Sequence, residues 1–125
     1  GFTKGGLVYI DREYVFTDIP GILSAATLIK TAMVDRSSRA KDQTTFHISR
    51  PATVIVCYDS RAKRTPKWLK DWKKLKARIS TTDRACKLVL YAKRFPVGKV
   101  VLSGNNSVPG VSANHIIAVT PAPIP

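Results

Sequence analysis

The segment TVIVCY at residues 53–58 decides the fold class, because its apolar residues follow one another almost without interruption. A short apolar run of this kind, rich in β-branched residues, is typical of a central strand that is covered on both faces of a sheet. Arg50-Pro51 precedes the segment and marks a corner, since proline cannot donate a backbone hydrogen bond to a ladder. We therefore expect the middle of the chain to form the centre of a β-sheet.

Strand patterns continue on both sides of this segment. TTFHIS at 44–49 alternates apolar with polar residues, as a half-buried strand does. Further short apolar runs, separated by turn residues, lie at 7–10, 14–16, 25–34, 87–95, 99–102 and 112–119. This rhythm predicts an all-β fold, an antiparallel β-sandwich.

The chain has 125 residues, a length that suits one domain with a buried core. We expect a single β-sandwich domain over residues 1–119 and a Pro-rich tail at 120–125, whose prolines cannot join the interior of a ladder. No run approaches the roughly 18 apolar residues that a membrane-spanning helix needs. Since the chain begins with Gly1 and opens without a leader pattern, we interpret it as a processed or excised piece, an interpretation that is compatible with export.

One segment departs from the strand rhythm. Its apolar side chains recur at helical spacing, on Trp68, Leu69, Trp72, Leu75 and Ile79. These positions follow one stripe of a helix, and the preceding proline suits a first helical turn. The sequence thus predicts a short amphipathic helix near 66–76, laid across the sandwich with its lysines in water.

The chain is strongly basic, with 21 lysines and arginines against 8 acidic residues and a net charge of +13. Nine of these cations and a single acid, Asp71, fall between Arg61 and Arg78. A segment so one-sided attracts polyanions, although a charged face that only keeps the protein soluble is the alternative. We expect a ligand-binding face formed by Arg61, Lys63, Arg64, Lys67, Lys70, Lys73 and Lys74.

Two tryptophans, Trp68 and Trp72, would share one face of the expected helix because they lie four residues apart. If exposed, they would form a stacking platform for sugar rings or bases. The interpretation that we favour is that both attach the helix to the sheet, since leucine and isoleucine side chains share their stripe.

The other reactive residue types form no pattern of a catalytic or metal site. Cys57 and Cys86 lie in two apolar runs, where they either form one cross-strand disulfide or remain buried free thiols. The histidines, His47 and His115, lack the paired spacing of a metal site or a catalytic triad. No glycine-rich phosphate loop is present. We expect a non-catalytic protein with no cofactor and no metal.

Three phrases of the sequence resemble a domain family of secreted bacterial proteins. They are LVYIDREYVFTDIP at 7–20, CYDSRAKRTPKWLKDW at 57–72 and LYAKRFPVGKVVLSGN at 90–105. The residues that carry the likeness are Tyr58, Asp59, Arg61, Pro66, Trp68 and Leu69, then Leu90, Tyr91, Lys93, Phe95, Pro96, Gly98, Val100, Leu102, Gly104 and Asn105.

In these phrases the chain resembles the non-catalytic β-sandwich domains found C-terminal to polysaccharide lyases and other extracellular proteins. The resemblance implies a jelly-roll-like sandwich similar to carbohydrate-binding modules, and it implies no particular ligand. Ser103, where a glycine is usual, and the many lysines depart from the family pattern. The lysines favour a polyanion over a neutral sugar as the ligand.

These observations predict a non-catalytic module, extracellular or on the cell surface, that binds an acidic polymer through residues 61–78. An acidic polysaccharide is the first choice of polymer. A structural subunit of an extracellular filament, sheath or surface layer is the first alternative, because free sheet edges can pair between copies. Nucleic-acid binding is the second alternative, since it requires only the basic face.

Overall fold

A computed structural model describes residues 2, 4–31, 43–61, 64–82, 87–104 and 115–121 of the chain. Its strands are β1 (Phe16–Asp18), β2 (Thr27–Ile29), β3 (Thr44–Ile48), β4 (Ala52–Asp59), β5 (Lys73–Thr81), β6 (Lys87–Phe95), β7 (Gly98–Leu102) and β8 (Ile116–Thr120). Two single-turn 3-10 helices are described, η1 (Gly21–Leu23) and η3 (Lys67–Leu69). Every pair of neighbouring strands is antiparallel, so the predicted all-β class is confirmed.

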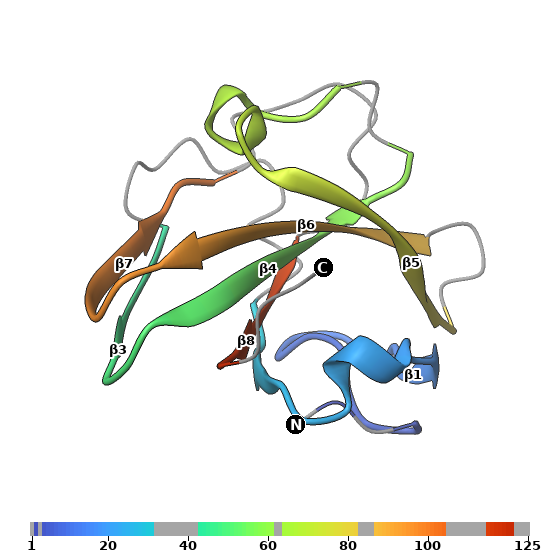
Figure 1. Ribbon diagram of the computed structural model, residues 1–125. Coiled ribbons are helices and arrows are strands. Elements are labelled where there is room, and N and C mark those ends of the chain that lie inside the picture. Colours follow the sequence, from blue (N-terminus) through green and yellow to red (C-terminus); the bar gives the residue numbers. More distant parts are fainter. Residues whose placement is uncertain are drawn as a thin grey trace.

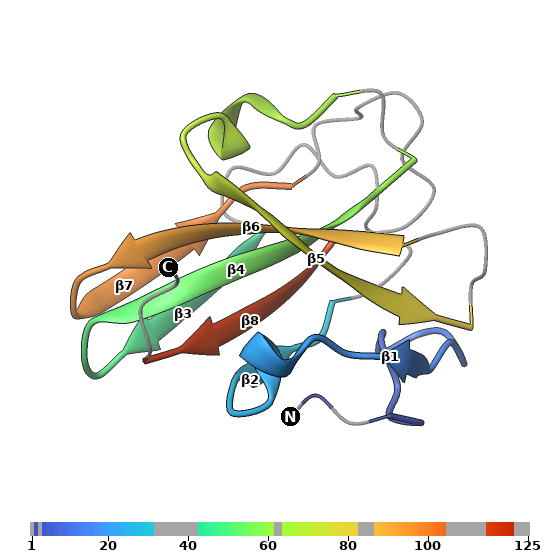
Figure 2. The ribbon, with the colours of Figure 1, turned by 45° about the vertical axis from the view of Figure 1, so that its right-hand side comes forward.

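The strands form two sheets of unequal size (Figure 1). The larger sheet has six strands in the order β1-β5-β6-β4-β8-β2, and the smaller sheet pairs β3 with β7. The large sheet is strongly twisted, so that β5 crosses β6 at a steep angle (Figure 2). A curled antiparallel sheet is what the structure shows, and the jelly-roll form of the prediction goes beyond it.

Two tight corners send the chain from one sheet to the other. β3 and β4 follow each other across Arg50-Pro51, and β6 and β7 follow each other across Pro96-Val97, yet neither pair is hydrogen-bonded. Gly98 at the second corner has φ of 135°, a backbone conformation that favours glycine. Both corners were predicted as turns, but their residues do not reveal that the chain changes sheets there.

The predicted central strand is confirmed. All eight residues of β4 are buried, and the strand lies between β6 and β8 in the middle of the large sheet. Its side chains alternate between two apolar clusters, one on each face of the sheet. A strand that is covered on both faces needs apolar residues at consecutive positions, which is what the segment at 53–58 provides.

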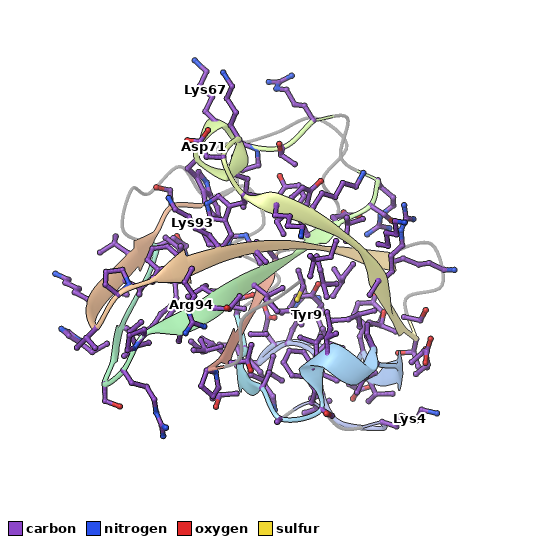
Figure 3. All side chains as sticks on the ribbon, viewed as in Figure 1. Lys4, Tyr9, Lys67, Asp71, Lys93 and Arg94 are labelled. Atoms are coloured by element: carbon purple, nitrogen blue, oxygen red, sulfur yellow. The ribbon has the colours of Figure 1, made fainter. Side chains whose placement is uncertain are left out.

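The first face of the large sheet is covered by the N-terminal part of the chain. Ile55 and Cys57 point to this face and pack with Tyr9, Phe16 and Leu23. Figure 3 shows Tyr9 between the sheet and the β1 region. We call this side the N-terminal face.

The second face is covered at one end by the β3–β7 pair. Val54 and Val56 point to it and pack with Val100 and Leu102 of β7. Trp72 closes the middle of this face, 8% exposed. We call this side the β3–β7 face, and its other end, near β5, carries the candidate site.

The predicted helix near 66–76 is wrong. Only the single turn η3 is helical, and the chain then extends into β5. Leu75 and Ile79 lie four residues apart, a spacing that places them on one side of a helix and also on one side of a strand. Pairing with β6 decides between the two, because it satisfies backbone groups that would otherwise remain unpaired along that strand.

Other boundaries differ by smaller amounts. The region 7–10 contributes only an isolated bridge, Leu7 to Val15, rather than a strand. The run at 25–34 is a strand only over β2, and its end lies outside the described residues. β8 ends at Thr120, one residue beyond the predicted domain boundary, while residues 122–125 of the tail also lie outside.

Cys57 is fully buried, and burial raises the pKa of its thiol. Its neighbour in the ladder is Leu90. Cys86 lies outside the described residues, so the predicted Cys57–Cys86 bond stays a prediction.

Candidate functional site

The basic residues singled out in the sequence fall on three pieces of structure: the segment between β4 and η3, the η3 turn, and the start of β5. Lys67 belongs to η3 and Lys70 follows it directly, whereas Lys73 and Lys74 begin β5. Lys63 lies outside the described residues. Figure 3 shows Lys67 projecting away from the sheet at the top of the molecule.

Arg61 takes a structural position. Its backbone N–H and its Nε both donate to Asp59 Oδ1, at 2.9 and 3.0 Å, and Nη2 donates to Oδ2 at 3.3 Å. The Asp59 side chain is fully buried, so this charge-assisted pair neutralises it at the end of β4. Arg61 therefore stabilises the turn after β4, and its role in ligand binding stays a prediction.

The remaining cations between residues 64 and 78 are all exposed. We call this part of the chain the basic segment, with Arg64, Lys67, Lys70, Lys73, Lys74, Lys76 and Arg78 as its cations. Its one acidic residue, Asp71, is also exposed and stands beside η3 in Figure 3. Seven positive charges against one negative charge give this segment +6.

The two tryptophans pack into the molecule. Trp72 is buried, and its ring contacts those of Trp68, at 6.0 Å between centroids, and Phe95, at 5.7 Å. Trp68 is half-buried, and its Nε1 donates a 2.8 Å hydrogen bond to the carbonyl oxygen of Gly104. Both rings therefore contact other aromatic rings, and a stacking role for Trp68 and Trp72 stays a prediction.

The Trp68–Gly104 bond also joins two phrases that carry the family resemblance. Trp68 belongs to the phrase at 57–72 and Gly104 to the phrase at 90–105. Pro66 and Leu69 of the first phrase are buried, as is Leu102 of the second. These residues therefore hold the loops against the β3–β7 face.

A cavity of about 290 Å³ lies at the β5 end of the β3–β7 face. Its lining residues come from β4, β5, β6 and the segment after β4. The lining residues are Tyr58, Asp59, Ser60, Arg64, Thr65, Lys74, Arg78, Val89 and Tyr91. We call it the tyrosine cavity. Three cations of the basic segment thus meet around two tyrosines.

The irregular pairing of β5 with β6 brings two of these cations together. Lys74 lies opposite Tyr91 and Arg78 opposite Val89, with a register shift between them. Four residues of β5 therefore match two residues of β6, a distance of about 7 Å in a strand. Bulges of this kind redirect side chains and are frequent beside functional sites. Here the bulge concentrates positive charge over Tyr91.

The hydroxyl of Tyr58 is buried and has no hydrogen-bond partner in the described part of the chain. The pKa of this phenol is raised by burial first and by the Asp59 carboxylate second, while Arg64 opposes the rise. Burial also raises the pKa of Tyr91, against the effect of Arg78. Both hydroxyls therefore stay protonated at neutral pH and can donate a hydrogen bond.

Neither the two tyrosines nor Arg78 were among the ligand-binding residues expected from the sequence. The signal was present in the KKLKARIST segment, whose cations at 74, 76 and 78 alternate with less exposed residues. Read with a strand period, this alternation places Lys74 and Arg78 on one side. Tyr58 and Tyr91 face the same side through β4 and β6.

A second cavity, of about 360 Å³, lies between β2 and β3. Ile29, Phe46, Ile48 and Val119 give it an apolar lining, and Arg50 is the one charged side chain among its described residues. No group of three His, Cys, Asp or Glu side chains comes together among the described residues to hold a metal ion. Nor does that part of the chain contain a helix long and apolar enough to span a membrane.

The topology defines a class of small antiparallel β-domain, and comparisons show where else it occurs. No protein-family model matches the chain, and no curated protein matches it. A solved structure with a similar fold is a β-glucuronidase from glycoside hydrolase family 2, with a TM-score of 0.83 and 20% sequence identity. The likeness covers 94% of this chain and 12% of that chain.

At 20% identity this likeness shows a shared fold alone. The chain is similar to a domain-sized part of a carbohydrate-active enzyme. That enzyme is a glycoside hydrolase rather than a polysaccharide lyase, so the lyase part of the resemblance stays a prediction.

Proposed function

We propose that this chain is a non-catalytic, jelly-roll-like module that works outside the cell and binds an acidic polysaccharide through its basic segment. The observation that carries the proposal is the +6 charge of residues 64–78, whose seven cations are all exposed. Clustered positive charges raise the local concentration of a polyanion and speed its association. The fold shared with a small part of a glycoside hydrolase supports a role beside carbohydrate chemistry.

Electrophoresis through gels that contain polygalacturonate tests the proposal. The protein should be retarded at low ionic strength, and the retardation should weaken steeply near 0.1 M salt, where exposed charges are screened beyond about 10 Å. Gels with a neutral polysaccharide and gels with DNA distinguish an acidic sugar polymer from the other classes of ligand. Equal or stronger retardation by DNA would favour the nucleic-acid alternative.

A pair of matched variants locates the binding. One replaces Lys67, Lys70 and Lys76 with glutamine, and the other replaces Lys4, Lys30 and Lys99, all of them exposed lysines. Figure 3 shows Lys4 and Lys67 at opposite ends of the molecule. Both variants lose three charges, so an effect of net charge alone would be equal. We expect about a tenfold loss of affinity in the first variant and less than a twofold loss in the second.

Assembly through sheet edges is the second candidate function. Val97, just before β7, is 58% exposed, and Val101, within β7, is 45% exposed. The strand β7 has a single strand partner among the described residues. Open edges of this kind can pair with another copy. Light scattering at moderate salt separates the two candidates, since assembly predicts polymers and the binding module predicts a monomer.

A further inference from the structure

We propose that the tyrosine cavity takes one uronic-acid unit of the polymer, with the sugar carboxylate held by Arg64, Lys74 and Arg78. This inference rests on the proposed function and specifies its ligand. The basic segment alone would attract any polyanion, whereas a cavity with fixed donors selects a chemical group.

The charges around the cavity favour one anionic group. Among the described residues of the lining Asp59 is the only acidic one, and Arg61 already forms a double contact with it. Arg64, Lys74 and Arg78 therefore supply the positive charge that a ligand meets. An arginine fork matches the two oxygens of a carboxylate, while a lysine acts as a point charge.

Tyr58 supplies the donor that the protein leaves unused. Its hydroxyl is buried without a partner in the described part of the chain, which is unusual because a buried polar group without a hydrogen bond is costly. The tyrosine lines the cavity together with the exposed residue Arg64. A ligand group that enters the cavity would give this hydroxyl an acceptor.

The size and the walls of the cavity suit a single sugar ring. Its volume of about 290 Å³ lies at the lower end of the range for small-ligand sites. Val89 and the half-exposed ring of Tyr91 form an apolar strip along β6. A pyranose ring has weakly polar C–H faces that pack on such a strip, with its hydroxyls toward Ser60.

Titration with free glucuronic acid and free galacturonic acid, followed by amide NMR shifts, tests this proposal. Galactose and glucose serve as neutral counterparts of the same ring size. We expect one of the two acids to shift amides of β5 and β6 around Arg78 and Val89, and the neutral sugars to leave them in place. Shifts spread evenly over the basic segment would overturn the cavity as the site.

Substitutions separate specific contacts from general charge. Arg78→Gln should weaken binding of the acid at least tenfold, because it removes a charge-assisted pair of hydrogen bonds. Arg78→Lys keeps the charge and should still lose several-fold, because the fork is gone. Lys70→Gln removes the same charge outside the cavity and should change affinity less than twofold. Equal effects of Arg78→Gln and Lys70→Gln would contradict the proposal.

The two proposals fail differently. If polygalacturonate retards the protein while neither uronic acid shifts the cavity amides, the cavity inference is wrong and the general function stands. If an acid binds in the cavity while the polymer does not retard the protein, the polymer-binding function is wrong. If neither ligand binds, both are wrong.

Discussion

The two ends of the β3–β7 face are built from the same strands but differ in chemistry. At one end the paired strands β3 and β7 cover Val54 and Val56 of β4, and the contacts are apolar. At the other end no strand of the described part of the chain lies over Tyr58, and the cavity beside it is lined by cations. The residue types along β4 therefore follow what covers them. Apolar side chains pack best under an apolar cover. A tyrosine also tolerates polar neighbours, because its ring is apolar but its hydroxyl is polar.

The largest expected effect concerns Trp72, which stands between the two ends. Its ring contacts Phe95 on the covered side and Trp68 of the loop region. Trp72→Ala should lower the free energy of unfolding by about 3–5 kcal/mol, as measured by urea denaturation. Trp68→Phe keeps an aromatic ring and loses the bond to Gly104, so it should cost only about 1 kcal/mol. If Trp72→Ala lowered the free energy of unfolding by less than 1 kcal/mol, Trp72 would not be a packing contact that the two ends share.

His115 provides the next test, because it lies among the aromatic rings at the same boundary. Its ring is stacked on Tyr58 at 6.4 Å and meets Trp68 edge to face at 5.6 Å. Burial lowers the pKa of His115 from 6.5 to about 4. In the unfolded chain the ring gains a proton below about pH 6.5, but in the folded protein it stays neutral until about pH 4.

Stability from this residue is therefore present above pH 6.5 and lost as the pH falls toward 4. The free energy of unfolding should decrease by about 3 kcal/mol over that interval through His115 alone. Urea denaturation at several pH values, compared between the parent and His115→Gln, isolates the contribution. His47→Gln, a change at an exposed position of β3, should keep the full slope. Parallel pH profiles for the parent and His115→Gln would show that the ring is protonated without cost.

The sequence predicted the covered end of the sheet well. β3, β4, β6 and β7 agree with the predicted runs to within a residue or two, because their apolar patterns are short, strong and bounded by proline or glycine. The pairing of these strands was not predictable, since β3 pairs with β7 across a wide separation in the sequence. Local patterns contain no information on which distant edge a strand will meet.

The open end was predicted less well. The spacing of Leu75 and Ile79 fits a helix as well as a strand. Only the hydrogen bonding with β6 favours the strand β5 over a helix. The basic segment was found from its charge alone. The cavity was missed, since it depends on the bulge between Lys74 and Arg78 and on tyrosines from two other strands. The side chains at those positions come together only in the folded sheet.

The smallest expected effect is the sharpest test of the contrast between the two ends. Tyr58→Phe removes one hydroxyl and keeps the ring that packs on His115 and Tyr91. Removing a buried polar group that lacks a partner should leave stability unchanged or raise it by about 1 kcal/mol. The same substitution at a hydrogen-bonded tyrosine would lower stability by a similar amount. Urea denaturation of the free protein therefore reports whether the hydroxyl is unused before a ligand arrives. If Tyr58→Phe destabilises the free protein by 1 kcal/mol or more, the hydroxyl already has a partner, and the open end is as fully satisfied as the covered one. If stability is unchanged while the affinity for a uronic acid falls, the protein keeps this donor for its ligand.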